Sequence, residues 1–254
     1  MSQEDKIEQA AELIKKSNYI VAFTGAGISV ESGIPDFRSP GGLWEKYNPN
    51  EYATYSTFLT HPEKYWIMHK ELRDMIIDAK PNSAHIALAD LEFKYGKLKA
   101  VITQNVDFLH SRAGNTKVLE IHGTTQTSRC LSCDKQFIYT EVEAFLDQGQ
   151  LPPRCPQCDG LIKTNTILFG EEMPRDVMQQ ARDEVVAADL LIIIGSSLTI
   201  YPAAALPSLA VQAGKRILIV NKEFTPMDTY ANVSIRGMAG VIMPKIMSTL
   251  KEIS

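Results

Sequence analysis

Residues 19–38 read YIVAFTGAGISVESGIPDFR, and this stretch indicates the fold class of the chain. It begins with an apolar run, Tyr19 to Phe23, which is too short for a helix and rich in β-forming residues, so a buried strand is predicted. Gly25 and Gly27 follow directly. Glycines just beyond a first strand let the backbone approach a pyrophosphate, and a helix that begins there directs its free N–H groups at the phosphates.

The glycine pattern alone is weak, because Val30 stands where the usual dinucleotide fingerprint has its third glycine. The simpler interpretation is a tight strand-to-helix turn. The continuation favours ligand binding, since Phe37 and Arg38 add an aromatic ring and a permanent cation to the same loop. A phosphate-bearing ligand is therefore predicted here.

The composition is that of an ordinary globular protein, with 44% apolar and 22% charged residues among 254. This length suffices for one large domain, or for a large and a small one. The net charge of −4 argues against a general nucleic-acid binder, and no apolar run reaches the length of a membrane span. The polar start MSQEDKIEQA does not resemble a signal peptide, so a cytoplasmic location is expected, in which cysteines stay reduced.

Helical and strand patterns alternate along most of the chain, which predicts an α/β fold with a mostly parallel sheet covered on both faces. Residues 39–60 have a loop composition, and residues 126–163, with all four cysteines, have that of an inserted module. Strands are expected at 19–23, 98–103, 117–121, 166–169, 190–194, 216–220 and near 233, and helices at 3–17, 60–79, 81–96, from 174, at 202–214 and at the carboxyl end.

Polar residues follow five of the predicted strands. Because parallel strands end at one edge of a sheet, these clusters are expected to converge on one cleft. Turn formation explains any single cluster equally well, but an amide, a carboxylate and a histidine among them favour a functional site. The clusters are Thr24–Gly27, Gln104–Asp107, His122-Gly123, Gly195–Ser197 and Asn221.

His122 is the candidate general base. It stands at a predicted strand end, and an imidazole with a pKa near 6.5 can take a proton from a hydroxyl at neutral pH. A single histidine is more often structural, and this is the interpretation given to His110, which lies on a predicted short helix after Asp107.

The four cysteines form two C-x2-C pairs, Cys130 with Cys133 and Cys155 with Cys158. Two such pairs are typical of one tetrahedral structural zinc ion, bound by four thiolates with no position left open for chemistry. A pair of redox motifs is the disfavoured alternative.

Taken together, these motifs resemble the sirtuin family of NAD-dependent protein deacylases. The resemblance extends over nearly the whole chain, with the motifs in the expected order. The motifs are GAGIS at 25–29, GIPDFR at 33–38, TQNVD at 103–107 with Leu109 and His110, His122-Gly123, the two cysteine pairs, FGE at 169–171, GSS at 195–197 and Val220-Asn221.

The resemblance implies a Rossmann-like large domain of residues 1–38, 80–125 and 164–254. It also implies a small domain made of a helical insertion, 39–79, and a zinc module, 126–163. NAD and an acyl-lysine protein or peptide would enter between these domains, the peptide as an added strand. The peptide contacts implied are Ile167, Phe169, Gly170, Glu171 and Tyr201.

The resemblance assigns catalysis to His122, Asn105 and Asp107. The acyl oxygen would displace nicotinamide from C1′ of its ribose, and His122 would then activate a ribose hydroxyl, so that the 2′-oxygen attacks the amidate carbon. Water would then release lysine and O-acyl-ADP-ribose. The residues implied for NAD are Gly25, Ala26, Gly27, Val30, Phe37, Arg38, Gln104, Asn105, Val106, Asp107, Gly195, Ser196, Ser197, Asn221, Lys222 and Met238.

Two departures from the family pattern concern the substrate side. Phe108 stands where the family often has glycine, and Lys163-Thr164-Asn165 stands where it often has Arg-Pro-Asp. Members that remove succinyl groups carry a Tyr-x-x-Arg pair, and alignment on Trp66 places His69 and Leu72 at those positions. A preference for neutral acyl groups is therefore expected, with acetyl first.

Two other functions are compatible with an NAD site. Mono-ADP-ribosyl transfer to a protein would use the same activated ribose, and an NAD-sensing adaptor would use no chemistry. The adaptor is disfavoured because Asn105, Asp107 and His122 are all present.

Overall fold

The computed structural model describes residues 2–253, which divide into two compact units. The larger unit contains the chain up to Phe37, Ala79–Ile121 and the chain from Arg175 onward. The smaller unit contains Arg38–Asp78 and His122–Pro174. Each unit encloses a hydrophobic core of its own.

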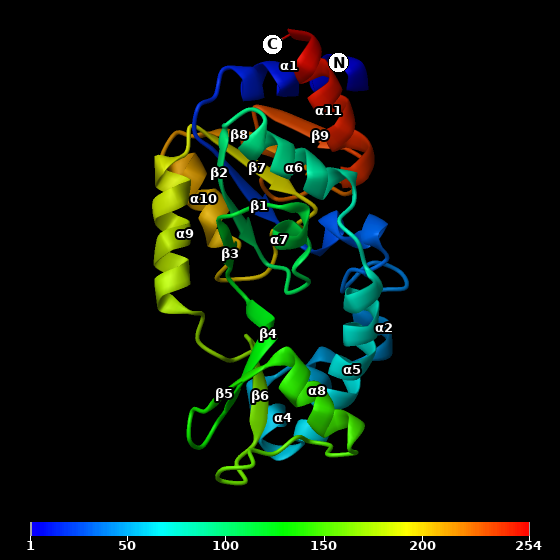
Figure 1. The fold of residues 1–254 in the computed structure, drawn as a ribbon. Coiled ribbons are helices and arrows are strands. Elements are labelled where there is room, and N and C mark those ends of the chain that lie inside the picture. The colour runs from blue at the N-terminus through cyan, green and yellow to red at the C-terminus, as the bar shows by residue number, and fades with distance from the viewer. Residues whose placement is uncertain (1, 254) are drawn as a thin grey trace. The chain divides into compact units, whose positions relative to one another are not determined.

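The larger unit is built on a six-stranded, entirely parallel sheet, which confirms the predicted α/β class (Figure 1). The strand order is β3-β2-β1-β7-β8-β9, so the order reverses between β1 and β7. Ligands of such sheets bind beyond the carboxyl ends of the strands at this point. The strands are β1 (Ile20–Thr24), β2 (Leu98–Thr103), β3 (Val118–Glu120), β7 (Leu190–Ile194), β8 (Arg216–Asn221) and β9 (Val233–Arg236).

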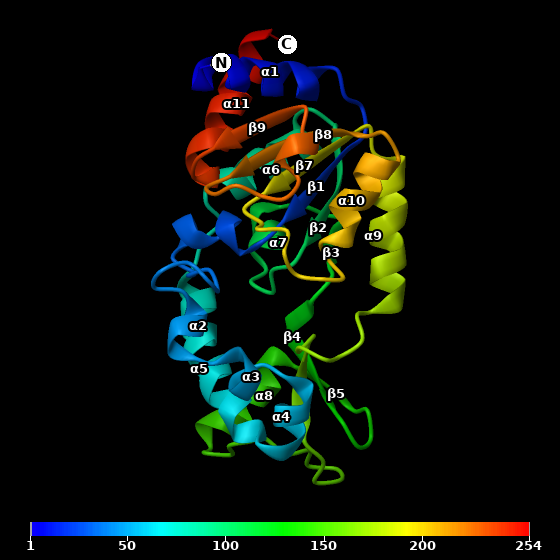
Figure 2. The same cartoon turned by 180° about the vertical axis from the view of Figure 1, so that it is seen from behind.

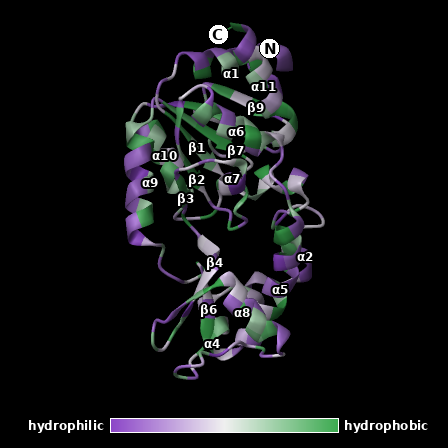
Figure 3. Ribbon diagram, in the orientation of Figure 1, coloured by the Kyte–Doolittle hydropathy of each residue, from purple (hydrophilic) through white to green (hydrophobic). Residues whose placement is uncertain are grey.

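Helices cover both faces of this sheet, and every residue of the central strands β1 and β7 is buried. Alternate strand residues pack with α1, α6 and α11 into the main core. Helices α9 and α10 lie on the opposite face (Figures 1 and 2), and the strands between the layers are strongly hydrophobic (Figure 3). The helices are α1 (Gln3–Lys15), α6 (Ser83–Phe93), α7 (Leu109–Ala113), α9 (Arg175–Ala187), α10 (Ala205–Gln212) and α11 (Ala239–Ile253).

The smaller unit combines the long helix α5 and several short helices with a three-stranded antiparallel sheet in the order β5-β4-β6. Trp66, Phe58 and Phe137 are buried in its core, which also contains Cys130 and Cys155. The elements are α2 (Leu43–Lys46), α3 (Pro49–Tyr52), α4 (Tyr55–Thr60), α5 (Pro62–Asp78), β4 (Gly123–Cys130), β5 (Gln136–Ile138), α8 (Tyr139–Asp147) and β6 (Ile162–Thr166).

The prediction of a strand at 166–169 in the parallel sheet is wrong. The strand in this region is β6, which ends at Thr166 and pairs antiparallel with β4 in the smaller unit. Its residues Lys163 and Thr164 are polar yet buried, so the segment lacks the apolar pattern from which strands were predicted. The structure accordingly groups 122–125 and 164–174 with the smaller unit, whereas the sequence assigned them to the larger domain.

The helix predicted after the glycine turn is also wrong, because this stretch forms two single 3₁₀ turns, Ala26–Ile28 and Val30–Ser32. Gly33 ends the second turn in the left-handed region, with φ 89°. Residues 39–60, predicted as irregular, contain α2, α3 and α4, and the helix expected from 202 begins at Ala205. Among the described residues, no helix is both long and apolar enough to cross a bilayer.

Candidate active site

Three glycines bring the ends of β1 and β7 into backbone contact where the strand order reverses. The Gly25 N–H donates to the Ile194 carbonyl at 3.1 Å, and the Gly27 N–H donates to the Gly195 carbonyl at 2.8 Å. A Cβ added at Gly27 would lie 2.8 Å from the Cα of Gly195, and Gly195 itself has φ +61°. Larger residues would therefore separate the two strand ends, which are the expected place for a dinucleotide.

A buried hydrogen-bond cluster lies beside these glycines and joins the first loop to the loop after β2. Ser29 Oγ donates to Asp107 Oδ2 at 2.6 Å, and Asn105 Nδ2 donates to Ser29 Oγ at 3.1 Å and to the Gly25 carbonyl at 3.2 Å. The structure thus brings together the two predicted residues Asn105 and Asp107. Ser29 was not assigned a role from the sequence, although it lies within the GAGIS motif.

Asp107 is held as a hydrogen-bond acceptor. Its side chain is buried, and burial raises its pKa, whereas hydrogen bonds from Ser29 and from the Leu109 N–H, the latter at 2.9 Å, lower it. Between Asp107 and Leu109, Phe108 has φ 66°, in the left-handed region that glycine adopts more easily. Phe108 therefore adopts the left-handed backbone conformation that is expected of the glycine in the family pattern.

Gln104 and Ser196 connect the ends of β2 and β7. Gln104 Nε2 donates to Ser196 Oγ at 2.8 Å, and Ser196 Oγ also accepts from the Leu198 N–H at 3.3 Å. These two residues were predicted to contact NAD, and the structure places both at the carboxyl edge of the larger unit's sheet. Ser197 is exposed next to them.

His110 has a structural position, as predicted. Its Nε2 lies 2.9 Å from Thr24 Oγ1, and its ring packs against His85 with centroids 4.8 Å apart. Burial lowers the pKa of His110 to about 3 and that of His85 to about 4. Both imidazoles are therefore neutral at physiological pH.

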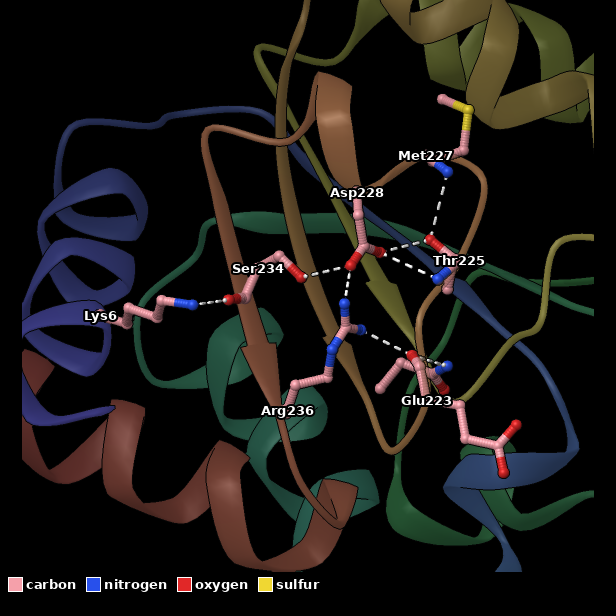
Figure 4. Close-up of polar contacts among 8 residues, drawn as sticks. Lys6, Glu223, Thr225, Met227, Asp228, Ser234 and Arg236 are labelled. Atoms are coloured by element: carbon pink, nitrogen blue, oxygen red, sulfur yellow. Dashed lines mark hydrogen bonds and ion pairs between the residues drawn. The ribbon is translucent and has the colours of Figure 1, made fainter. Parts of the chain in front are cut away.

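The loop after β8 is fixed by a second polar cluster, shown in Figure 4. Arg236 forms an ion pair with Asp228, donates to the Glu223 carbonyl at 2.6 Å and lies over the Phe224 ring, 3.7 Å from its centroid. Asn221 Nδ2 donates to the same Glu223 carbonyl at 2.9 Å. The predicted residues Asn221 and Lys222 thus begin a loop whose shape depends on Arg236. The contacts of Arg236 with Asp228 and the Glu223 carbonyl are not evident from the sequence.

In the smaller unit, His122 begins the segment that leads into β4. Its carbonyl accepts from the Ile167 N–H at 2.8 Å, so this backbone bond holds it beside β6. Gly123 has φ +73°, and a Cβ there would lie 1.9 Å from the Asn165 carbonyl oxygen. Only glycine fits this contact, which sets the direction in which the chain leaves His122.

Four of the five predicted peptide-binding residues, all except Tyr201, lie in a turn after β6. The Phe169 N–H donates to the Ala53 carbonyl and its carbonyl accepts from the Tyr55 N–H, both at 2.9 Å, while Phe169 as a whole is 42% exposed. The Glu171 side chain is only 9% exposed, because its carboxylate is bound by Lys163 within the unit. Glu171 therefore supports the turn from inside, and Phe169 and Gly170 form its outer edge.

Most other predicted NAD residues are half-buried or exposed in the larger unit, and Tyr201 is exposed there too. Arg38 belongs to the smaller unit. The half-buried residues are Ala26, Gly27, Val30, Val106 and Gly195, and the exposed ones are Phe37, Lys222 and Met238.

The four cysteines form one cluster in the smaller unit, with their Sγ atoms within 4.8 Å of one another. The Sγ–Sγ distances are 3.5 Å for Cys130–Cys158 and 3.7 Å for Cys133–Cys155. A disulfide needs about 2.05 Å. Thiolates about 2.3 Å from a tetrahedral zinc ion lie about 3.8 Å apart, so the cluster fits zinc. The Ser132 N–H points at Cys130 Sγ at 3.4 Å, as expected around a thiolate ligand.

Comparisons with known proteins agree with this geometry. The Sir2 family model matches residues 25–202. NAD-dependent protein deacylase 2 of Archaeoglobus fulgidus is 44% identical over 251 residues, 98% of either chain. A structure solved to explain the mechanism and regulation of Sir2 enzymes has a TM-score of 0.93 at 44% identity, covering 99% of this chain and 100% of that one. A Sir2 complex with a p53 peptide and NAD+ has a TM-score of 0.89 at 38% identity, covering 100% of both chains.

Proposed function

The chain belongs to the Sir2 family, and we propose that it is an NAD-dependent deacylase that removes acetyl and other neutral acyl groups from protein lysine. NAD is the co-substrate, water is consumed, and the products are lysine, nicotinamide and O-acyl-ADP-ribose. The observation that carries the proposal is the buried Asn105–Ser29–Asp107 cluster at the point where the strand order reverses. The experiment is to incubate an acetyl-lysine peptide with the protein, which should remove the acetyl group only when NAD is present.

Each part of the proposed site has a distinct role. Asn105 and Asp107 hold the carboxamide end of nicotinamide, and Gln104 contacts the adjoining ribose. His122 takes the proton from a ribose hydroxyl, because an imidazole is a suitable base at neutral pH. The loop that begins at Asn221 holds the adenosine half.

The remaining assignments concern the substrate and the metal. Phe169 and Gly170 are exposed at the turn after β6. The Phe169 N–H and carbonyl are already bonded to Ala53 and Tyr55, so the adjacent Gly170 is the residue at which an extended acyl-lysine peptide adds as a strand. The zinc ion at the four cysteines is structural, because four thiolates leave no open coordination position. Four reduced cysteines also suit a cytoplasmic location.

The role of Asp107 can be tested by substitution with asparagine. The Asp107→Asn side chain can no longer accept from both Ser29 and the Leu109 N–H. Nicotinamide exchange into NAD should fall about 10- to 100-fold, the value of a charge-assisted hydrogen bond of about 1.5–3 kcal/mol. Asp90→Asn, at an ion pair with Lys94 on the surface of α6, is the matched control and should leave exchange unchanged. Equal exchange rates in Asp107→Asn and the unmodified protein would disprove the assignment.

The acyl preference follows from α5. Leu72 packs against the core of the smaller unit, and burial lowers the pKa of His69 to about 4, so neither provides a cation. The neighbouring Arg73 forms ion pairs with Glu143 and Asp74. A succinyl carboxylate would therefore have no cationic partner among these side chains.

We expect kcat/KM to be at least about 100-fold higher for an acetyl-lysine peptide than for its succinyl counterpart, given the cost of an unpaired buried charge. Leu72→Arg should raise the rate on the succinyl peptide, whereas Leu72→Met, which adds no charge, should not. A succinyl peptide that is processed as fast as the acetyl peptide would show that the interpretation of Leu72 is mistaken.

A further inference from the structure

We propose that Lys163 is a positioning residue for the acyl-lysine peptide, acting through the turn that carries Phe169 and Gly170. The proposal rests on the proposed function, because it concerns the substrate edge of that site. Lys163 lies on β6, and its side chain is only 2% exposed. An ammonium group has three donors, and here each has a partner.

The partners of Lys163 join β6 to the turn. Its Nζ donates to the Thr166 carbonyl at 2.6 Å and to the Thr164 carbonyl at 3.1 Å, and it lies 2.9 Å from Glu171 Oε2. The same carboxylate oxygen accepts from the Leu168 N–H at 2.7 Å. The ammonium and carboxylate thus close the turn from Thr166 to Glu171 on itself.

This ion pair is buried, so its geometry is restrictive. Burial lowers the pKa of Lys163, and the nearby Glu171 carboxylate opposes that shift. A buried pair of charges is costly unless it is well bonded, and removal of one partner leaves the other charge uncompensated. Among the ion pairs of the described residues, the Lys163–Glu171 pair stands out because both of its side chains are less than a tenth exposed. Such a pair fixes the turn far more firmly than a pair in water would.

The turn has a second attachment, through the backbone of Phe169, and its exposed residues are Phe169 and Gly170. On one side the Phe169 N–H and carbonyl bond to Ala53 and Tyr55. Its ring lies 6.3 Å from that of Trp44, and the residue is 42% exposed. At Gly170 the chain turns with φ +87°, next to Glu171. Lys163 and Glu171 therefore determine where these exposed residues lie, without contact with a peptide themselves.

The test compares Lys163→Met with Lys163→Arg, Glu171→Gln and the double variant Lys163→Met with Glu171→Gln. Lys163→Met should raise the KM for an acetyl-lysine peptide about 10- to 100-fold, since charge-assisted hydrogen bonds are lost. The KM for NAD should stay within about twofold, because neither Lys163 nor its partners Thr164, Thr166 and Glu171 are among the residues assigned to NAD. Lys163→Arg keeps the charge and should recover part of the loss.

The double variant separates positioning from simple charge loss. It removes both buried charges, so its melting temperature should be higher than that of Lys163→Met. Its KM for the peptide should nevertheless stay raised, because the ion pair that holds the turn is still absent. Lys64→Met, at a surface ion pair with Glu51 in the same unit, is the matched control and should change neither KM. Peptide binding to each variant, measured by fluorescence anisotropy without NAD, should weaken in parallel with KM.

Equal rises in both KM values, or an unchanged peptide KM in Lys163→Met, would overturn the proposal. If Lys163→Met fails to fold, the double variant and Glu171→Gln test the proposal instead. Normal peptide affinity in both of these variants would overturn the proposal. Deacetylation by the unmodified protein is measured in parallel. Its absence would count against the proposed function, whereas its presence with normal peptide affinity in the variants would count against Lys163 alone.

Discussion

His122→Ala is expected to lower the rate of deacetylation about 10²- to 10⁴-fold, which is the usual contribution of a general base. The variant should still bind NAD. The structure explains why the loss should be specific. The His122 carbonyl, not its ring, bonds to the Ile167 N–H, so alanine keeps the backbone contact. Gly123, which sets the direction of the chain there, is also unchanged.

The measurement is single-turnover deacetylation together with NAD binding by calorimetry. His61→Ala is the matched control, because His61 lies in the same unit with its side chain 61% exposed and forms an ion pair with Glu63. It should deacetylate at the unmodified rate. If His122→Ala does the same, another group is the base.

Loss of zinc is expected to unfold the smaller unit. Structural zinc contributes about 10–16 kcal/mol to the folding of zinc-finger peptides at neutral pH, which is as large as the whole stability of a typical domain, about 5–15 kcal/mol. Cys130 and Cys155 belong to the core of the unit, so released thiols would disturb the packing around them. Cys155→Ser should therefore aggregate or melt at a much lower temperature.

Zinc content by mass spectrometry and thermal melting with and without chelator test this prediction. We expect one zinc ion per chain in the unmodified protein and a large fall in melting temperature with chelator. Ser132→Ala, which lies between two ligands but keeps all four thiols, is the control and should retain zinc. Protein that is purified without chelator, contains no zinc and melts normally would contradict the assignment.

The sequence predicts best where a local pattern reports a local structure. The apolar runs of β1 and β7 are buried on both faces, and the residues after them lie at one edge of the sheet, as expected from parallel strands. The cysteine pairs gather as their spacing predicts. These features depend on residues that are near in sequence or on a topology common to α/β folds.

The sequence fails where burial depends on a distant partner. Lys163 and Thr164 carry polar side chains, so β6 was missed, and only the fold shows that Glu171 and Tyr65 provide their partners. Ser29 and Asp107 meet across two loops, and Arg236 reaches Asp228 through the turn after β8. Such pairings decide the shape of the site and have no signature in a single sequence.

The central claim is that the acyl group moves from lysine to ADP-ribose. We would incubate the protein with NAD labelled in its adenylate half and an acetyl-lysine peptide, then separate the products. The account predicts one nicotinamide and one labelled O-acetyl-ADP-ribose for each acetyl group removed, and neither product without the peptide. Label attached to protein, or nicotinamide released equally with an unacetylated peptide, would contradict it.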